Sequence, residues 1–308
     1  MILLIKKLMK WKKYLKYKGD NMYKKSIKEN SKFLIPFVEG LKYYGSNKIE
    51  HALGTMIVLN DKGDILTCKH IAEEFIRNDK LGVMYGQLMS EINNCKNKDE
   101  VNNVLKKYNI KDDSVVLTNI NLPFEINGSI DIKIKMHKYL DIALIKISNV
   151  NIKADKYPIF AKELPLQGQS VCKLGFAFPE YDFFEYSKKL ENIVMKKDIV
   201  ASFPLFPMDG IVTRLIMDEN NNLSMFETST PGIRGQSGGP VFSPEGLIYG
   251  MQSMTKQLDL NFDVKGKVKR GFNDKNVHYT PFINLGVCIS SKEIIKFLDE
   301  NGVEYKSE

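Results

Sequence analysis

Arginine is scarce in this sequence: only Arg77, Arg214, Arg234 and Arg270 occur among its 308 residues. Nucleic-acid binders usually carry an arginine-rich stripe of positive charge, because guanidinium groups contact phosphates and bases in bidentate fashion. The excess charge lies at one end instead. Residues 1–30 hold ten lysines and two acidic residues, a surplus of eight that equals the whole net charge of +8. We therefore expect no nucleic-acid partner.

Cysteine is also rare, and its spacing argues against the usual cysteine-based sites. Neither a zinc site nor a disulfide framework is indicated, because no C-x-x-C pair occurs. Reduced thiols in the cytoplasm are the plain interpretation, and no phosphate-binding loop or dinucleotide fingerprint is present. We expect a cytoplasmic bacterial protein without cofactor or metal. The four cysteines are Cys68, Cys95, Cys172 and Cys288.

Long apolar runs are missing, and the one segment with membrane character lies at the N-terminus. Residues 1–18 have the pattern of a cationic amphipathic helix that could lie on an anionic membrane. Lys6 and Lys7 break the apolar opening, so it is not a secretory signal. In AT-rich codons, Lys18–Met22 permits a bacterial ribosome-binding sequence just before an ATG, which favours Met22 as the start. We expect residues 1–30 to be a basic leader, with membrane contact only if residues 1–21 are translated.

Beyond the leader, short apolar segments separated by turn residues predict an all-β fold. Ten segments have the composition or alternation of strands, and that number favours a barrel or a sandwich. The predicted strands are 54–59, 64–67, 130–136, 142–147, 170–174, 210–217, 223–228, 241–242, 246–252 and 285–289.

Two helices and one long loop are expected beside these strands. A helix is predicted within residues 82–108, which are rich in Lys, Glu and Asn. A second should run from Ser291 to Asn301, because Ser290 and Glu293 form a capping box and Gly302 marks a stop. The polar stretch 254–279 predicts a long loop.

The strongest chemical signal is the run Gly235-Gln236-Ser237-Gly238-Gly239-Pro240. Glycines around a serine allow a tight turn that exposes Oγ and aims the amides of Gly235 and Ser237 at one point, where an oxyanion could sit. The same residues also match the G-x-S-x-G motif of the nucleophile elbow in α/β-hydrolases, where a helix follows the serine at once. Here the proline that follows prevents that helix. An ordinary glycine-rich loop is the other alternative, so partners for the serine are needed.

Two such partners lie upstream in a definite order. His70 follows a β-rich apolar stretch, and Asp141 stands at the mouth of the apolar segment 142–147. With Ser237 they give the order His, Asp, Ser at separations of 71 and 96 residues, which is the order in chymotrypsin-type enzymes.

These motifs resemble the trypsin-like serine endopeptidases of the chymotrypsin fold, and most closely the HtrA-type protease domains. The resemblance covers about residues 53–301 and implies a double β-barrel with the site in the cleft. We expect the first barrel at 31–160, with a helical insertion, and the second at 161–290. A C-terminal helix and tail should follow at 291–308.

The resemblance assigns roles by position. Ser237 would be the nucleophile, His70 the general base and then acid, and Asp141 the carboxylate that orients the imidazole. The amides of Gly235 and Ser237 would form the oxyanion hole. The pocket for the substrate side chain would involve Pro231, Gly232, Ser253, Met254, Thr255 and Gly286. No carboxylate falls at its base, so cleavage after Lys or Arg is not favoured, and small or medium apolar side chains are expected.

Two departures from the family pattern affect how the site would be controlled. Gln236 stands where zymogen-activated members have an aspartate, and no activation sequence precedes the first barrel. The 71 residues after Ser237 leave no room for a PDZ domain. An activating partner therefore stays open as an alternative.

We predict a serine endopeptidase, a hydrolase that cleaves protein or peptide substrates by way of an acyl-enzyme. A catalytically silent member of the same fold that binds partners is one alternative. An esterase that uses the same serine is the other.

Overall fold

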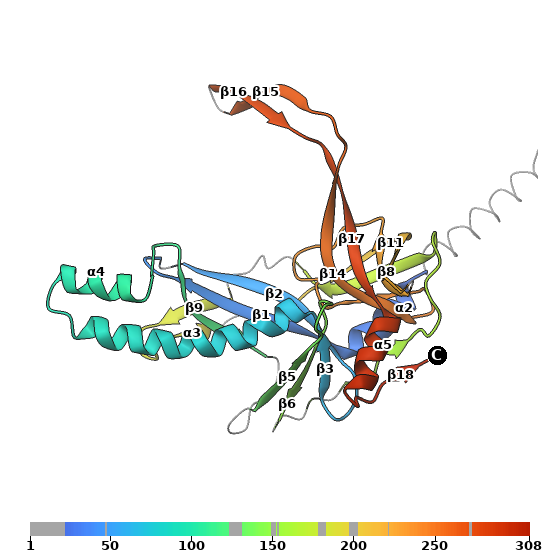
Figure 1. The fold of residues 1–308 in the computed structure, drawn as a ribbon, viewed down its shortest axis with the longest axis horizontal. Coiled ribbons are helices and arrows are strands. Elements are labelled where there is room, and N and C mark those ends of the chain that lie inside the picture. The colour runs from blue at the N-terminus through green and yellow to red at the C-terminus, as the bar shows by residue number, and fades with distance from the viewer. Residues whose placement is uncertain are drawn as a thin grey trace, which may run out of the picture.

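Two β-sheets with the same strand order contain most of the strands of the chain, and Figure 1 shows the fold. The computed structural model describes residues 22–46, 48–122, 131–148, 152, 154–177, 183–196, 203–220, 222–270 and 273–308, so the predicted amphipathic segment lies outside the described residues. In both sheets the six strands, numbered along the chain, lie in the order fourth, first, second, third, sixth, fifth. The all-β prediction is confirmed.

The first sheet has the order β4-β1-β2-β3-β6-β5, and all its neighbours are antiparallel. Its central strands are continuous apolar runs, and Ile65, Leu66 and Ile145 are almost completely buried. Burial on both faces of such a run is typical of a strand inside a core. The strands are β1 (Leu34–Tyr43), β2 (Ile49–Val58), β3 (Asp64–Thr67), β4 (Val115–Asn121), β5 (Ile132–Met136) and β6 (Ala143–Ile147).

The second sheet closes into a barrel. Its order is β13-β8-β11-β12-β17-β14, and β13 pairs with both β8 and β14, so these six strands form a ring. Two short strands, β7 (Ile159–Phe160) and β18 (Lys306–Ser307), extend it beside β14. The ring consists of β8 (Ser170–Phe176), β11 (Leu205–Met217), β12 (Leu223–Thr228), β13 (Pro240–Phe242), β14 (Ile248–Asp259) and β17 (Phe282–Ser290).

Two helices lie between strands of the first sheet, and another follows the last strand of the barrel. The insertion consists of α3 (Lys69–Asn93) and α4 (Lys98–Lys107), so the predicted start at residue 82 is wrong. Helix α3 begins immediately after β3, because Ile71, Ala72 and Phe75 form an apolar face that packs into the first core. Helix α5 (Ser291–Glu300) begins as predicted, with Ser290 Oγ accepting a hydrogen bond from the amide of Glu293 at 3.3 Å.

Part of the segment assigned to the leader belongs to the folded body. Helix α2 (Lys24–Asn30) and the 3₁₀ turn η1 (Ser31–Phe33) precede β1. The ring of Tyr23 packs edge-on against Phe242 at 6.3 Å, and Asn30 Nδ2 donates to the carbonyl of Gly246 at 3.3 Å. Residues 22–33 therefore contact the second barrel. No helix in the described part of the chain is both long enough and apolar enough to traverse a bilayer.

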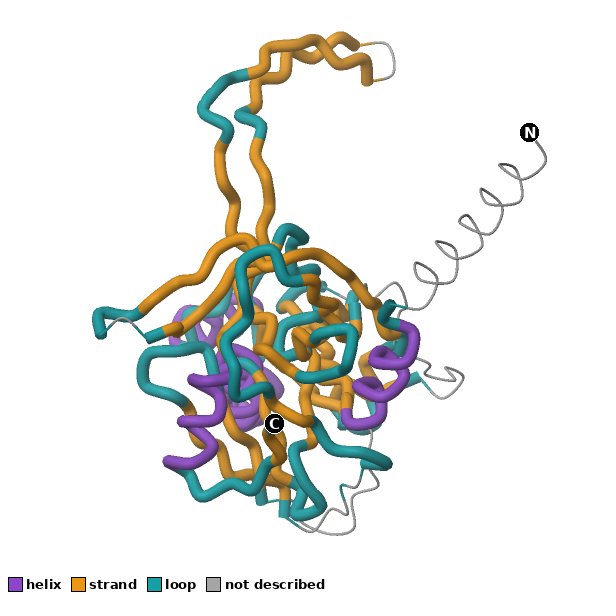
Figure 2. Tube along the Cα trace, turned by 90° about the vertical axis from the view of Figure 1, so that its right-hand side faces the viewer, coloured by secondary structure: helices purple, strands orange, loops and turns teal. Residues whose placement is uncertain are grey.

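A long hairpin replaces the loop predicted for residues 254–279. Strands β14 and β17 continue past the barrel, and β15 (Val264–Arg270) and β16 (Asn273–Tyr279) extend them as an arm that stands out from the body (Figures 1 and 2). The loop prediction is wrong because lysines alternate with valines here, and a two-stranded ribbon exposed on both faces tolerates that polar composition.

A smaller hairpin connects the second half of the chain to the first. Strands β9 (Phe184–Ser187) and β10 (Asn192–Met195) pair with each other. The hydroxyls of Tyr186 in β9 and Tyr85 in α3 are 2.8 Å apart, and Asn119 of β4 donates to the carbonyl of Ile193 at 2.7 Å. This hairpin thus packs across the insertion and the edge of the first sheet.

Candidate active site

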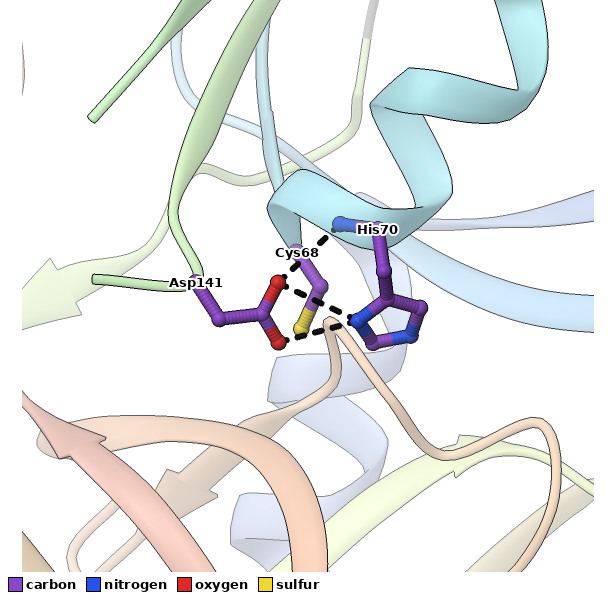
Figure 3. A group of neighbouring side chains, drawn as sticks. All are labelled: Cys68, His70 and Asp141. Carbon is purple, nitrogen blue, oxygen red and sulfur yellow. Dashed lines mark hydrogen bonds and ion pairs between the residues drawn. The ribbon is translucent and has the colours of Figure 1, made fainter. Parts of the chain in front are cut away.

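His70 and Asp141 come together because the strands that carry them are neighbours. His70 is the second residue of α3, directly after β3, and Asp141 lies just before β6, the strand paired with β3. His70 Nδ1 lies 2.9 Å from Asp141 Oδ2 and 3.1 Å from Oδ1 (Figure 3). The amide of His70 also donates to Oδ1 at 3.0 Å. Three contacts therefore fix the imidazole against the carboxylate.

Each residue of this pair stabilises the charged form of the other. The hydrogen bond with Asp141 raises the pKa of His70 above its ordinary value. Burial by itself raises the pKa of Asp141, but the hydrogen bonds from His70 and Ser253 outweigh this effect and hold that pKa below its usual range. Near neutral pH the carboxylate is ionised. The Nε2 atom of His70 lies on the far side of the ring from Asp141, and the side chain is half exposed (Figure 3).

Ser253 links the carboxylate to the predicted nucleophile. Its Oγ donates to Asp141 Oδ2 at 2.6 Å, and its carbonyl oxygen accepts a hydrogen bond from Ser237 Oγ at 3.1 Å. Within the described residues, Ser237 Oγ donates to Ser253 and forms no hydrogen bond with His70. The sequence placed Ser253 in the substrate pocket alone, since no local pattern marks a serine that reaches a carboxylate 112 residues away.

The loop before Ser237 has the backbone that the glycine pattern predicted. The amide of Gln236 donates to the carbonyl of Ile233 at 2.9 Å, and Gly235 has φ +99°, as in a type II turn. A Cβ at position 235 would collide with the carbonyl oxygen of Phe176. In the described part of the chain, the amides of Gly235 and Ser237 donate to no other group, so both can bind an incoming oxygen.

The side chain of Gln236 holds this turn in shape. It is completely buried. Its Oε1 accepts a hydrogen bond from the amide of Ile233 at 3.2 Å, and its Nε2 donates to the carbonyl of Phe206 at 2.8 Å. The residue that departs from the zymogen pattern thus anchors the loop through neutral hydrogen bonds.

A second anchor comes from the first sheet. Thr55 of β2 is fully buried, and its hydroxyl accepts a hydrogen bond from the amide of Phe176 at 3.0 Å. That hydroxyl also donates to the carbonyl of Gly235, and the Thr55 amide donates to the carbonyl of Ser237 at 2.9 Å. Thr55 was identified in the sequence only as part of a strand.

The residues predicted to line the substrate pocket lie close together. Thr255 Oγ1 donates to the carbonyl of Gly232 at 2.6 Å, and Thr255 is the register partner of Gly286 in β17. Met254 is 53% exposed beside them, and the carbonyl of Pro231 accepts a hydrogen bond from Lys173. Lys173, which the sequence analysis did not single out, therefore reaches this region from β8.

One group of side chains has the ligand types that could bind a metal ion. The donor atoms of Cys68, His70 and Asp141 lie within 4.8 Å of one another (Figure 3). Burial raises the pKa of the Cys68 thiol well above its ordinary value, and Sγ lies 3.4 Å from the carbonyl of Gln252. The thiol is thus a protonated packing group, and His70 and Asp141 are already paired with each other.

Comparison with known proteins agrees with this architecture. Residues 54–251, more than half of the chain, match the trypsin-like peptidase domain. A search of curated proteins finds no match. Among solved structures, a serine endoprotease from Yersinia pestis matches with 16% identity and a TM-score of 0.43, over 90% of this chain and 65% of the other. The present chain thus spans slightly less than two thirds of that protein. The predicted chymotrypsin-like fold is confirmed, and the chain belongs to the family of trypsin-like peptidase domains.

Proposed function

We propose that this protein is a serine endopeptidase that hydrolyses peptide bonds through an acyl-enzyme. The observation that carries the proposal is the chain of contacts from His70 through Asp141 and Ser253 to Ser237. It joins a base, its orienting carboxylate and a nucleophilic hydroxyl beside two amides that have no acceptor among the described residues. Acyl transfer needs these groups, and it needs no cofactor.

Acylation would begin when Ser237 Oγ attacks the carbonyl carbon of the peptide bond. The hydroxyl first turns from the Ser253 carbonyl toward His70, whose Nε2 takes the proton. Catalytic hydrogen bonds are often absent or long before substrate binds. Asp141 keeps Nδ1 protonated, so that Nε2 is the basic nitrogen. The carbonyl oxygen becomes an oxyanion held by the amides of Gly235 and Ser237.

The intermediate then collapses as His70 returns the proton to the leaving nitrogen. The C–N bond breaks, the amine departs, and the acyl group stays on Ser237. A water molecule repeats the cycle on the ester: His70 removes its proton, the water oxygen attacks the carbonyl, and Ser237 leaves with the proton restored. The net reaction consumes one water and yields a carboxylate and an amine.

A fluorophosphonate probe tests the assembled site directly. We expect covalent labelling at Ser237 in the wild-type protein, mapped by peptide mass spectrometry, and none in Ser237→Ala. His70→Ala should label far more slowly, and turnover of a peptide substrate should fall by about four to six orders of magnitude in either variant. Labelling of folded wild-type protein at another serine, or none at all, would contradict the proposal.

Substrate comparison separates the peptidase from its alternatives. An esterase would turn over small activated esters but leave casein and unfolded proteins intact. A silent binding module would process neither substrate. We expect cleavage of unfolded protein that is lost in Ser237→Ala.

A further inference from the structure

A lysine is buried inside the second barrel. Lys173 lies in β8, two residues after Val171. Residues two apart in a strand point to the same face, and Val171 belongs to the apolar cluster of the barrel interior. Only 1% of Lys173 is exposed. Its ammonium donates to Thr228 Oγ1 at 3.2 Å, to the carbonyl of Thr230 at 2.5 Å and to that of Pro231 at 2.7 Å. Its three protons thus meet three neutral oxygens.

The ammonium lies where the substrate pocket should have its base. Pro231 and Gly286 are two of the residues predicted to line that pocket. A Cβ added at Gly286 would point at Lys173 Nζ from 2.7 Å and at Thr228 Oγ1 from 2.6 Å. The amide of Gly286 also donates to the carbonyl of Thr230 at 2.9 Å. Glycine at position 286 therefore leaves the space that the lysine head fills.

This cation has no ionic partner among the described residues. Burial lowers the pKa of Lys173 to about 8, so the amine is mostly protonated at pH 7. The titratable groups whose charge would act on it are the thiols of Cys288 in β17 and of its chain neighbour Cys172 in β8. Burial raises the pKa of both thiols to about 12, so they are neutral at that pH. The base of the pocket carries an uncompensated positive charge.

We propose that Lys173 makes this pocket selective for an acidic side chain, so that the enzyme cleaves after glutamate or aspartate. The inference rests on the proposed function and names its substrate class, in place of the small apolar side chain expected from the sequence. A substrate carboxylate would replace one neutral acceptor of the ammonium. The anion adds a Coulomb attraction that a neutral side chain such as glutamine cannot supply.

A hydrogen bond crosses the predicted entrance to the pocket. Thr255 lies at the surface, and its hydroxyl spans to the carbonyl of Gly232 at 2.6 Å. A substrate side chain has to displace this link, and a slender carboxylate can do so more readily than an aromatic ring. The geometry thus disfavours large apolar side chains, while the positive base disfavours Lys and Arg.

A matched pair of probes tests the selectivity without knowledge of the natural substrate. The probes are two peptidyl diphenyl phosphonates that differ only in carrying glutamate or glutamine at the position that enters the pocket. We expect Ser237 to be labelled about tenfold or more faster by the glutamate probe at pH 7. Lys173→Met should bring the ratio of the two rates close to one. Lys162→Met, which changes an exposed lysine, should leave the ratio unchanged.

The pH dependence of the same ratio gives a test that needs no variant. The charge on Lys173 is lost as the pH rises through about 8, so the glutamate preference should decline between pH 7 and 9. Because both probes react through the same His70, its titration cancels in the ratio. This arm applies even if Lys173→Met fails to fold.

Failure of the inference and failure of the proposed function look different. Fluorophosphonate labelling of Ser237 together with equal or faster reaction of the glutamine probe would overturn acidic selectivity and leave the peptidase intact. A glutamate preference that survives in folded Lys173→Met would also overturn the role of Lys173. Loss of all labelling would remove both proposals.

Discussion

Thr55 in the first sheet donates its hydroxyl to the carbonyl oxygen of Gly235, in the loop that precedes β13 of the second sheet, at 2.8 Å. The two residues are 180 positions apart in the chain. The loop that presents Ser237 is therefore held by the neighbouring sheet as well as by its own. Since His70 follows β3 and Asp141 precedes β6, both lie beside strands of that neighbouring sheet, and the contact of the loop with this sheet brings the predicted nucleophile close to its predicted base.

Thr55→Val should damage the chemical step more than substrate binding. Valine keeps the shape but leaves the Gly235 carbonyl and the Phe176 amide unpaired, which costs roughly 1–3 kcal/mol for each buried group. We expect kcat to fall about tenfold to a hundredfold with little change in KM, and Thr55→Ser to restore most of it. Steady-state kinetics with a peptide substrate measures both. A valine variant with normal kcat and a lower melting temperature would show that Thr55 only stabilises the fold.

The acid limb of the activity profile should report His70. Only the neutral imidazole can accept the proton of Ser237, and the bond with Asp141 raises the pKa of His70. Activity should therefore be lost, as the pH falls, at a midpoint above the 6.5 of a free histidine. Asp141→Asn removes the anionic partner, so the midpoint should move to lower pH and the plateau should drop by about four orders of magnitude. Measurements of kcat/KM from pH 5 to 9 test both expectations. If the midpoint of Asp141→Asn equals that of the wild type, Asp141 does not raise the pKa of His70.

Gln236→Met tests whether the buried side-chain amide holds the loop that carries the predicted oxyanion hole of Gly235 and Ser237. Methionine has a similar volume but cannot bond to Ile233 or Phe206, so the turn loses two supports. We expect kcat to fall by about tenfold to a hundredfold while KM stays near the wild-type value, because oxyanion stabilisation acts on the transition state. Equal losses in binding and turnover would point to a general disturbance of the cleft instead.

Glu39 should make the stability of the protein depend on pH. Burial raises its pKa to about 7, Glu74 adds to the rise, and Arg77 opposes it. A carboxyl whose pKa is raised on folding binds protons more tightly in the folded state. Its contribution to the free energy of unfolding is thus fully present below about pH 4.5 and declines as the pH rises toward 7.

Glu39→Gln removes that titration and provides the measurement. We expect the melting temperature of the variant, relative to wild type, to be higher at pH 8 than at pH 5. Glu304→Gln, which changes an exposed carboxylate paired with Lys62, should show no such difference. If Glu39→Gln melts at the same offset from wild type at both pH values, the pKa of Glu39 is not raised.

The sequence predicted the local features of this fold well. Strand bounds at 64–67 and 223–228 agree with β3 and β12, because turn residues flank compact apolar runs there. The turn around Gly235 was also foreseeable, since only glycine tolerates the required backbone. His70 and Asp141 were found because each borders a recognisable strand. Whether they form a triad with Ser237 is still a prediction for the labelling experiment.

The features that escaped prediction depend on contacts between distant segments. Lys173 looks like a polar interruption in an apolar strand, and its meaning appears only when β8 is placed beside the loop at 230–231. Ser253 reaches Asp141 through the alignment of two sheets. The arm was missed for a different reason: an exposed ribbon buries no face, so its sequence is mostly polar and lacks the large apolar residues that identify a strand in a core.

The hydrogen bonds of the Gln236 side chain have a practical consequence for protein engineering. The zymogen-activated members that the sequence resembles have an aspartate at this position. Here the loop is tied to Phe206 by a neutral group already inside the chain. We therefore expect a purification tag, a reporter or a targeting peptide joined upstream of residue 22 to leave the conformation of this loop unchanged.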